Sequence, residues 1–490
     1  MVAAPARTES AAETHKNYIG GEWRHATSGE TMENRSPADR DDLVGRFAAS
    51  SAQDVDAAIA AAEEAFRSWR LSSPIVRANI LEGRIPDVGR ELTREEGKTL
   101  KEGIGETTRA VQILRYYAGE AQQPSGEHYP SMNPHTLLYT VREPLGVVAI
   151  ITPWNFPIAI PAWKIAPALA FGNTIVFKPA SQTPLSAVRL VEALAEAGLP
   201  AGVLNMVTGS ASEIGDPLTT DRRVVAISFT GSNETGSALR RIASERGAKL
   251  QLELGGKNPA IVLADADLEH ALGHVVAGAM MSTGQKCTAT SRAIVDRRIL
   301  DRFTEMLVER VQGLKVGNPL DADSQIGPLI DERAAQRVTD EVQAAGEAGA
   351  DVLVGGKRLD GDLARGAFVA PALLGGVAPD SRLGQEEVFG PVLGVIAVDS
   401  MEEAMQVANQ VKFGLSASIF TRDLERALRF AREIEAGVVH VNSETAGAEP
   451  QVPFGGMKGS SSYSREQGKA AREFFTQTKT VYIDPPPAQA

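Results

Sequence analysis

Cysteine is almost absent from this chain of 490 residues, in which Cys287 is the only one. A single thiol cannot form an intramolecular disulfide or a metal cage built of thiolates, so both kinds of site are excluded. An isolated cysteine is most often a small buried hydrophobe, but residues 282–292 around this one are small and polar rather than apolar. A nucleophile is the functional alternative, and Cys287 alone does not decide between the two.

The chain also lacks an excess of basic residues. It has 50 Lys and Arg and 62 Asp and Glu, so the net charge is −12. A nucleic-acid partner would require a basic excess or patch, so the composition argues against one. No apolar run reaches the length that spans a bilayer. Residues 1–16 lack the apolar core of a signal peptide and are expected to form a disordered tail. Together with the single cysteine, this predicts a cytoplasmic protein.

Hydrophobic residues make up 43% of the chain, which fits a soluble globular protein of roughly two or three domains. Short β-branched runs alternate with longer helical patterns, which predicts βαβ units and parallel sheets. In a doubly wound fold the turns after the strands gather at the carboxyl edge, where ligands bind. A second set of such units, from residues 292–296 to 437–442, predicts a second α/β domain. The first set of strands is expected at residues 147–152, 174–178, 203–207 and 224–229.

The turn at residues 231–236 begins and ends with glycine and leads into a predicted helix. Its bare amides suit a phosphate, but the spacing alone is weak evidence and an ordinary helix cap is the alternative. No Lys-Ser/Thr pair follows Gly236, which excludes a P-loop. His270 and His274 are four residues apart, but they lack the intervening Glu of H-E-x-x-H and no thiol accompanies them, so no metal site is predicted.

Six segments of the chain are informative by their order and spacing: residues 153–157 (PWNFP), 177–180 (FKPA), 229–232 (FTGS), 252–258 (LELGGKN), 284–287 (GQKC) and 386–391 (EEVFGP). Through these segments the chain resembles the aldehyde dehydrogenase superfamily, from about residue 17 to residue 481. The resemblance implies an α/β fold with a Rossmann-type cofactor domain, a second α/β catalytic domain and a small β oligomerisation element. The expected boundaries are residues 1–124 and 147–254, residues 255–450, and residues 125–146 with 451–490, respectively.

The resemblance implies a catalytic role for four residues. Cys287 would add to the aldehyde carbon as a thiolate, and the Asn155 side chain with the Cys287 amide would stabilise the oxyanion. Glu253 matches the general base that activates the thiol or the hydrolytic water, although alone it resembles an exposed carboxylate in a glycine-rich turn. Lys164 matches a lysine near the oxyanion and proton path, and its alternative role is in helix packing.

The same resemblance assigns the cofactor, NADP or NAD. Lys178 and Glu387 would hold the two riboses, Phe389 would pack near the nicotinamide, and Gly231 with Ser232 would lie along the pyrophosphate. Relatives that use only NAD commonly carry Glu where this chain has Ser181, and a carboxylate there repels a 2′-phosphate. NADP is therefore expected to be accepted, and preference between the two stays open. The remaining expected cofactor contacts are Thr152, Pro153, Trp154 and Leu254.

Within the superfamily the chain looks most like the α-ketoglutaric semialdehyde (2,5-dioxovalerate) dehydrogenases. Succinic semialdehyde relatives often carry Arg where this chain has Trp163, so the distal carboxylate must be held differently. Arg292 is one candidate, and the loop at residues 443–447 is another. The other expected substrate contacts are Phe454 and the hydroxyls of Ser282, Thr283 and Ser291.

Several alternatives remain open at this stage: another semialdehyde, such as succinic or glutaric, a general aliphatic or aromatic aldehyde, a CoA-acylating enzyme and a non-catalytic member of the fold. Glu253 argues against the CoA-dependent class, whose members lack a base at that position. The three residues Cys287, Asn155 and Glu253 together argue against a non-catalytic protein. The apolar segment 136–142 and the C-terminal segment 479–483 are expected to form strands that would leave an unpaired edge in a monomer, so a homodimer or homotetramer is predicted.

Overall fold

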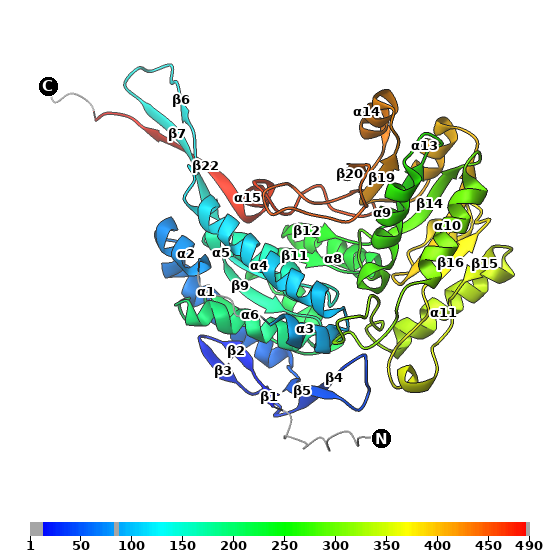
Figure 1. The fold of residues 1–490 in the computed structure, drawn as a ribbon. Helices are drawn as coiled ribbons and strands as arrows, with labels where there is room; N and C mark the ends of the chain where they lie inside the picture. The colour runs from blue at the N-terminus through cyan, green and yellow to red at the C-terminus, as the bar shows by residue number, and fades with distance from the viewer. Residues whose placement is uncertain (1–12, 83–87, 487–490) are drawn as a thin grey trace.

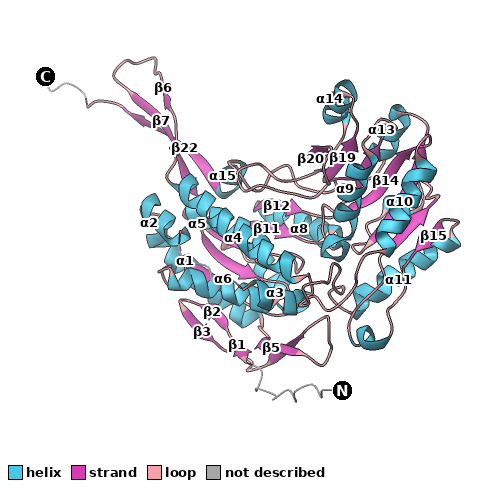
Figure 2. Ribbon diagram, in the orientation of Figure 1, coloured by secondary structure: helices cyan, strands magenta, loops and turns pink. Residues whose placement is uncertain are grey.

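Two seven-stranded sheets, each covered by helices on both faces, build the molecule (Figures 1 and 2). The structure is a computed structural model and describes residues 13–82 and 88–486. In this part of the chain no helix has the length and apolarity that crossing a bilayer requires.

The first sheet has five parallel strands and an antiparallel hairpin at one edge. Its central strands are continuous aliphatic runs because both of their faces are buried. All four strands expected in this region are confirmed, with ends shifted by one residue at most. In spatial order the strands are β12 (Lys249–Glu253), β11 (Val224–Thr230), β8 (Val147–Ile151), β9 (Thr174–Lys178), β10 (Leu204–Met206), β2 (Asn17–Ile19) and β3 (Glu22–Arg24).

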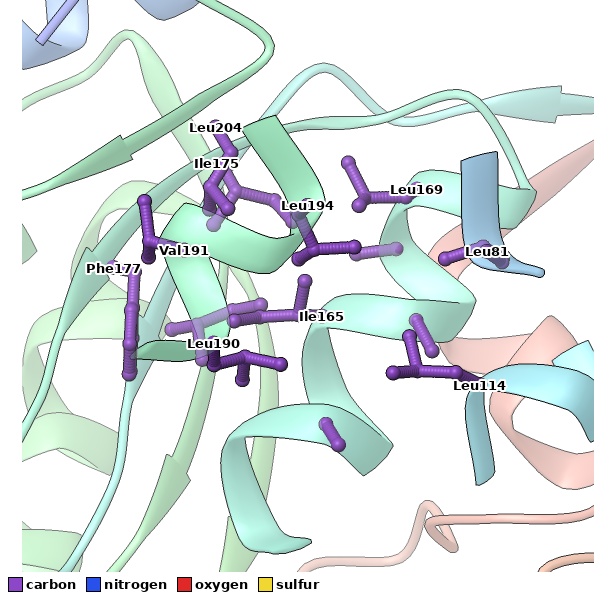
Figure 3. Packing of buried hydrophobic residues seen from close by; sticks show 14 of the residues in the cluster. Leu81, Leu114, Ile165, Leu169, Ile175, Phe177, Leu190, Val191, Leu194 and Leu204 are labelled. Carbon is purple, nitrogen blue, oxygen red and sulfur yellow. The ribbon is translucent and has the colours of Figure 1, made fainter. Parts of the chain in front are cut away.

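Alternate side chains of these strands enter two separate helix layers, because successive residues of a strand point to opposite faces. Val148 and Ile150 pack in one layer, whereas Val147 and Ala149 pack in the other. Figure 3 shows the first layer, where Ile165 and Leu190 meet beside the sheet. The first layer contains α2 (Pro74–Leu81), α3 (Gly89–Glu96), α4 (Leu100–Ala121), α5 (Ala159–Ala170) and α6 (Pro184–Glu196), and the second contains α1 (Ala52–Trp69), α7 (Ala211–Thr220) and α8 (Asn233–Arg246).

The second sheet confirms the expected second α/β unit and is parallel except for one edge strand. In spatial order its strands are β15 (Asp351–Val354), β16 (Ala372–Gly375), β17 (Val392–Val398), β14 (Thr290–Asp296), β13 (Asn258–Val262), β19 (Ser416–Phe420) and β20 (Val438–Val441). One face is covered by α9 (Leu268–Met280) and α10 (Leu300–Gln312), and the other by α11 (Glu332–Glu347), α12 (Arg382–Gln385), α13 (Met401–Asn409) and α14 (Leu424–Glu433).

A third sheet projects from the body of the molecule and carries the C-terminal end (Figure 1). It pairs β22 (Thr476–Ile483) with β7 (Leu137–Pro144) along eight residues, and β6 (His128–Tyr129) lies on the far side of β7. The two strands expected at residues 136–142 and 479–483 are thus present, and they pair with each other. Short helix α15 (Ala470–Phe475) connects this sheet to the body, and β18 (Phe413–Gly414) pairs with β21 (Met457–Lys458).

The expectation of a disordered tail at residues 1–16 needs correction at its end, while residues 1–12 lie outside the described part. Thr14 and His15 form β1 (Thr14–His15), which pairs in parallel with β5 (Leu43–Ala48), and β4 (Thr31–Arg35) completes a three-stranded sheet. His15 is buried and stacks on Phe47 with 4.8 Å between ring centroids. This tertiary contact orders a segment whose composition alone predicted disorder.

Candidate active site

Four strands of the first sheet end in register at one edge, and the expected site residues follow them. Ile151 pairs with Lys178 and with Phe229, and Thr230 pairs with Glu253. Thr152, Lys178, Gly231 and Glu253 therefore lie at the same carboxyl edge, as the doubly wound arrangement requires.

A cavity of about 980 Å³ opens between helices α4 and α5 of the first α/β unit and residues of the second, and Cys287 lies in its wall. The residue is partly exposed and follows η1 (Met281–Gly284), a tight turn before β14. Ser282 and Thr283 both have a φ of 53°, a left-handed conformation that costs non-glycine residues about 1–3 kcal/mol each. The turn is held by Glu102, which accepts from the Ser282 amide at 2.6 Å.

The thiol is surrounded by protein although part of its surface faces the cavity. Burial, with smaller contributions from the negative charges of Glu387 and Glu253, raises the pKa of Cys287 to about 12. A group with this pKa is protonated at neutral pH, so its conversion to a nucleophile requires a base or a positive charge nearby.

Glu253 is the carboxylate with the chemistry to act as that base. Burial and then the neighbouring Glu466 raise its pKa well above the usual value, which makes its ionised form a stronger proton acceptor. Its Oε2 accepts from the Ser461 hydroxyl at 2.6 Å, while Oε1 has no hydrogen-bond partner among the described residues. Glu253 thus keeps one acceptor atom that the described protein does not use.

Asn155 lies on the turn between β8 and α5 and is buried. Its Nδ2 donates to the carbonyl of Gln285, two residues before Cys287, at 2.9 Å. The side-chain amide nitrogen of asparagine has two N–H groups, so one of them remains for an oxyanion formed at the thiol.

Lys164 is completely buried and donates to Glu466 and, at 3.0 Å, to the Ser228 hydroxyl. The negative charge of Glu466 in turn helps to raise the pKa of Glu253. Lys164, Glu466 and Glu253 therefore form one electrostatically connected group. Sequence reasoning missed Glu466, which lies 302 residues from its lysine partner.

Two of the expected cofactor residues carry ionisable groups that are short of partners. Lys178 is buried, burial lowers its pKa to about 8, and its Nζ donates only to the adjacent Pro179 carbonyl at 3.2 Å among the described residues. Burial raises the pKa of Glu387 to about 7, and its Oε1 accepts from the Gly256 amide at 3.0 Å. Such groups suit the hydroxyls of a ribose, which both donate and accept.

The other expected cofactor residues lie around the same edge. Ser181 donates to the carbonyl of Gly209 at 2.8 Å, and exposed Ser232 caps the first turn of α8. Trp154 and Phe389 meet edge to face with 5.5 Å between ring centroids. Three features match parts of a dinucleotide: the exposed N-terminus of α8 suits the phosphates, the Lys178 cation suits a ribose, and the pair of aromatic rings suits the nicotinamide. The residues present therefore fit NAD(P). Two expected residues remain: Pro153 lies two residues after the end of β8, and Leu254 immediately follows β12.

The substrate contacts expected from the sequence are only partly brought together. Trp163 and Phe454 line the cavity with their ring centroids 5.8 Å apart, and Ser282 and part of the loop at residues 443–447 also line it. Thr283 does not, because its hydroxyl is buried and donates to the Gly327 carbonyl. Ser291 instead faces a separate, small pocket beside Glu387.

The expectation that Arg292 holds the substrate is corrected by the structure. Its side chain is completely buried beneath the site and donates to the carbonyls of Lys257, Val407 and Ala408. Each nitrogen of the guanidinium donates to a backbone carbonyl, and the side chain has no exposed surface at which a substrate could reach it.

Arg109 is a cation that the sequence did not single out. It lies on α4, is partly exposed and lines the cavity that contains Cys287. Its guanidinium makes no hydrogen bond or ion pair with any described residue, whereas Lys98 in the same wall is paired with Glu106. An arginine on a helix gives no signal in the sequence that its side chain lines a cavity.

A model of the aldehyde dehydrogenase family matches residues 23–481. The chain belongs to the aldehyde dehydrogenase family. It is 48% identical to an alpha-ketoglutaric semialdehyde dehydrogenase from Bacillus subtilis, covering 96% of this chain and 98% of the relative. It is 41% identical to a 2,5-dioxopentanoate dehydrogenase from Saccharolobus solfataricus, covering 93% and 96%. A betaine aldehyde dehydrogenase from Staphylococcus aureus, solved with NAD+, superposes with a TM-score of 0.93 at 35% identity, covering 97% and 95%.

As a member of this family the protein is an oxidoreductase that acts on aldehydes with NAD(P). The expected family and fold are confirmed. A small aldehyde fits the cavity, whose wall combines the thiol with the aromatic side chains of Trp163 and Phe454.

The raised pKa of Cys287 predicts how the thiol responds to pH. Its alkylation by iodoacetamide should be slow at neutral pH and should accelerate about tenfold per pH unit from about pH 7 to about pH 10, because only the thiolate reacts. The rate is followed by mass spectrometry, and the urea-unfolded chain, whose thiol has an ordinary pKa, is the control. A rate that levels off below about pH 9 in the folded protein would contradict the prediction.

Proposed function

We propose that the protein oxidises α-ketoglutaric semialdehyde to 2-oxoglutarate with NADP or NAD, through a covalent intermediate on Cys287. The observation that carries the proposal is the 48% identity, over nearly the whole length of both chains, to a relative named for this activity. A second relative of that name, from Haloferax volcanii, is 44% identical over 95% of this chain. Other semialdehydes and simple aldehydes are the alternative substrates.

Cys287, Glu253 and Asn155 each serve a different part of the reaction. Glu253 accepts the thiol proton, and the Cys287 sulfur forms a bond with the aldehyde carbon to give a thiohemiacetal. The negative oxygen accepts from Asn155 Nδ2 and the Cys287 amide, a kind of contact worth about 3 kcal/mol of barrier per donor. NAD(P), when bound, accepts the hydride that leaves this carbon. Glu253 first releases the thiol proton to solvent and then takes a proton from the water molecule that attacks the thioester. The bond between carbon and sulfur breaks, the proton on Glu253 passes to the sulfur, and the carboxylate and the thiol are released.

The buried carboxylate Glu253 favours this hydrolysis over transfer of the acyl group to CoA, which would need no base for water. Ser461 holds one of its oxygens, and the charges of Glu466 and Lys164 act on its pKa in opposite directions. A steady-state assay with and without CoA distinguishes the two outcomes.

Replacement of the base separates the two halves of the reaction. In Glu253→Gln at about pH 10, where part of the Cys287 thiol ionises without a base, we expect the thioester to form but its hydrolysis to slow by about 10²–10⁴-fold, the usual range for loss of a general base. Rapid-quench mass spectrometry after mixing with aldehyde and cofactor should show the acylated chain, and Cys287→Ala should show none. Slow turnover without a trapped acyl-enzyme would move the role of Glu253 to a step before the thioester.

NADP is proposed as an accepted cofactor because the Lys178 ammonium can donate to a phosphate at this carboxyl edge, and Ser181 nearby carries no negative charge that would repel one. The Ser181 hydroxyl, which donates to the Gly209 carbonyl, would have to turn away from it to donate to the phosphate as well. Ser181→Glu should lower the ratio of kcat/KM for NADP to that for NAD by about tenfold or more, since like charges placed together cost several kcal/mol. Ser181→Ala removes the hydroxyl without adding charge and should shift the ratio much less. An unchanged ratio in Ser181→Glu would refute this assignment.

Arg109 is proposed as the group that holds the distal carboxylate of the substrate. Arginine binds a carboxylate through two parallel N–H donors, and the guanidinium of Arg109 is uncommitted among the described residues. Lys101 also lines the cavity without a described partner, but it lies on an exposed turn of α4 two turns earlier. Arg109 is the less exposed of the two and is therefore preferred as the anchor.

The substrate assignment and its anchor are tested together with two aldehydes. Wild type should prefer α-ketoglutaric semialdehyde over pentanal in kcat/KM, and Arg109→Met should lose about 100-fold on the semialdehyde alone, as expected for a lost charge-assisted contact. Lys101→Met is the matched control and should change neither value appreciably. If Arg109→Met affects both aldehydes equally, Arg109 is not the anchor. If wild type prefers pentanal, the semialdehyde assignment itself fails.

We also propose the domain boundaries given by the sequence, a cytoplasmic location and assembly into a homodimer or homotetramer. Support for assembly comes from β22, which forms one edge of the projecting sheet and has only β7 beside it. Tyr482 and Ile483 on this strand are 66% and 49% exposed, and an open apolar edge favours pairing with another chain.

A further inference from the structure

A buried ion pair holds the turn that carries Asn155. Lys98 Nζ donates to Glu106 Oε2 at 2.6 Å and to the backbone carbonyl of Asn155 at 2.7 Å. The same ammonium lies 4.1 Å from the ring centroid of Phe156. Both charged side chains are at most 2% exposed, so the pair is shielded from water.

The second oxygen of Glu106 holds the other end of this turn. Its Oε1 accepts from the amides of Ile158 and Ala159, at 2.9 and 3.1 Å, where α5 begins. Ile158 has no side-chain oxygen with which to cap the helix, so the carboxylate of α4 serves as the cap. Two side chains thus fix residues 155–159 at three backbone atoms.

Stability alone does not account for this arrangement. Burying two charges costs several kcal/mol per ion, and apolar residues of similar volume are often equally stable or better. Burial acts to lower the pKa of Lys98, but Glu106 and Glu96 outweigh it and hold it above the usual value. The ammonium therefore stays charged, and its two contacts with the turn, the Asn155 carbonyl and the Phe156 ring, specify a geometry.

We propose that Lys98 and Glu106 are positioning residues that set the Asn155 amide for the oxyanion formed at Cys287. The inference rests on the proposed function, in which Asn155 donates to that oxygen. Asn155 Nδ2 is tied to the Cys287 loop through Gln285, while its backbone is tied to α4 through Lys98. A shift of the turn would move the donor relative to the sulfur, and a misplacement of about 1 Å can cost about 100-fold in rate.

Lys98→Met and Glu106→Gln test the pair, because methionine keeps the stem of lysine and glutamine keeps an oxygen for the α5 amides. We expect kcat for aldehyde oxidation to fall by about 10–100-fold while the Kd for NADP changes less than about threefold. Thermal melting checks the fold. Glu106→Gln is the milder change, and it decides the matter if Lys98→Met does not yield folded protein.

Glu95→Gln is the matched control. Glu95 is completely buried on neighbouring α3 and caps α6 as Glu106 caps α5, accepting from the amides of Leu185 and Ser186 at 2.6 and 2.9 Å. Its replacement should lower the melting temperature to a similar extent and leave kcat at saturating cofactor unchanged. An equal loss of kcat in Glu95→Gln would assign the effect to general destabilisation and overturn the proposal.

A double-mutant cycle with Asn155→Ala shows whether the pair acts through Asn155. If it does, Glu106→Gln should cost little further rate in the Asn155→Ala background, because coupled residues are not additive. The same fold-loss in both backgrounds would overturn the positioning role. If Asn155→Ala by itself leaves kcat unchanged, the oxyanion role in the proposed function fails instead.

Discussion

The removal of water from ionisable side chains is the constraint on which the rest of this site depends. Burial brings the pKa of Glu387 to about 7, that of Lys257 to about 7 and that of Lys178 to about 8. Groups with these values change charge near neutrality, so a bound ligand that supplies one charge or one hydrogen bond sets their state. The same desolvation keeps Cys287 protonated until Glu253 takes its proton. Burial therefore limits the reactivity of the thiol and also strengthens the base that releases it.

Close approach of backbone segments is what makes this burial possible, and glycine permits it at two positions. A Cβ on Gly256 would lie 2.6 Å from the carbonyl oxygen of Cys287, and one on Gly455 would lie 2.7 Å from Oε1 of Glu253. Gly455 also has a φ of 148°, a conformation that other residues rarely adopt. Cys287 thus packs closely against the backbone of Gly256, and Glu253 against that of Gly455, because neither glycine has a side chain in the way.

The sequence predicted what repeats along the chain and what lies in contiguous motifs. The four expected strands of the first sheet, and Lys178 at the end of one of them, could be placed because apolar runs end in distinctive turns. Glu253 was assigned through the family motif that contains it. Arg292 was misjudged because a motif position does not say on which side of a strand the side chain lies. Arg109 and Glu466 gave no signal, since an arginine in a helix or a glutamate in a polar loop becomes distinctive only through its distant neighbours. His15 was misjudged for the same reason.

The segment between residues 451 and 468 shows why a division into domains does not describe the site completely. The sequence grouped it with the oligomerisation element, yet Phe454 lines the cavity, Ser461 binds Glu253 and Glu466 binds Lys164. The chain passes from Glu466 through α15 to β22 without a long linker. The edge strand is therefore close along the chain to the segment that contacts the base. Pairing of β22 with another chain would restrain the segment that carries Ser461, the partner of Glu253, and Glu466, the partner of Lys164. An interface at this edge would then contribute to the geometry of the base as well as to assembly.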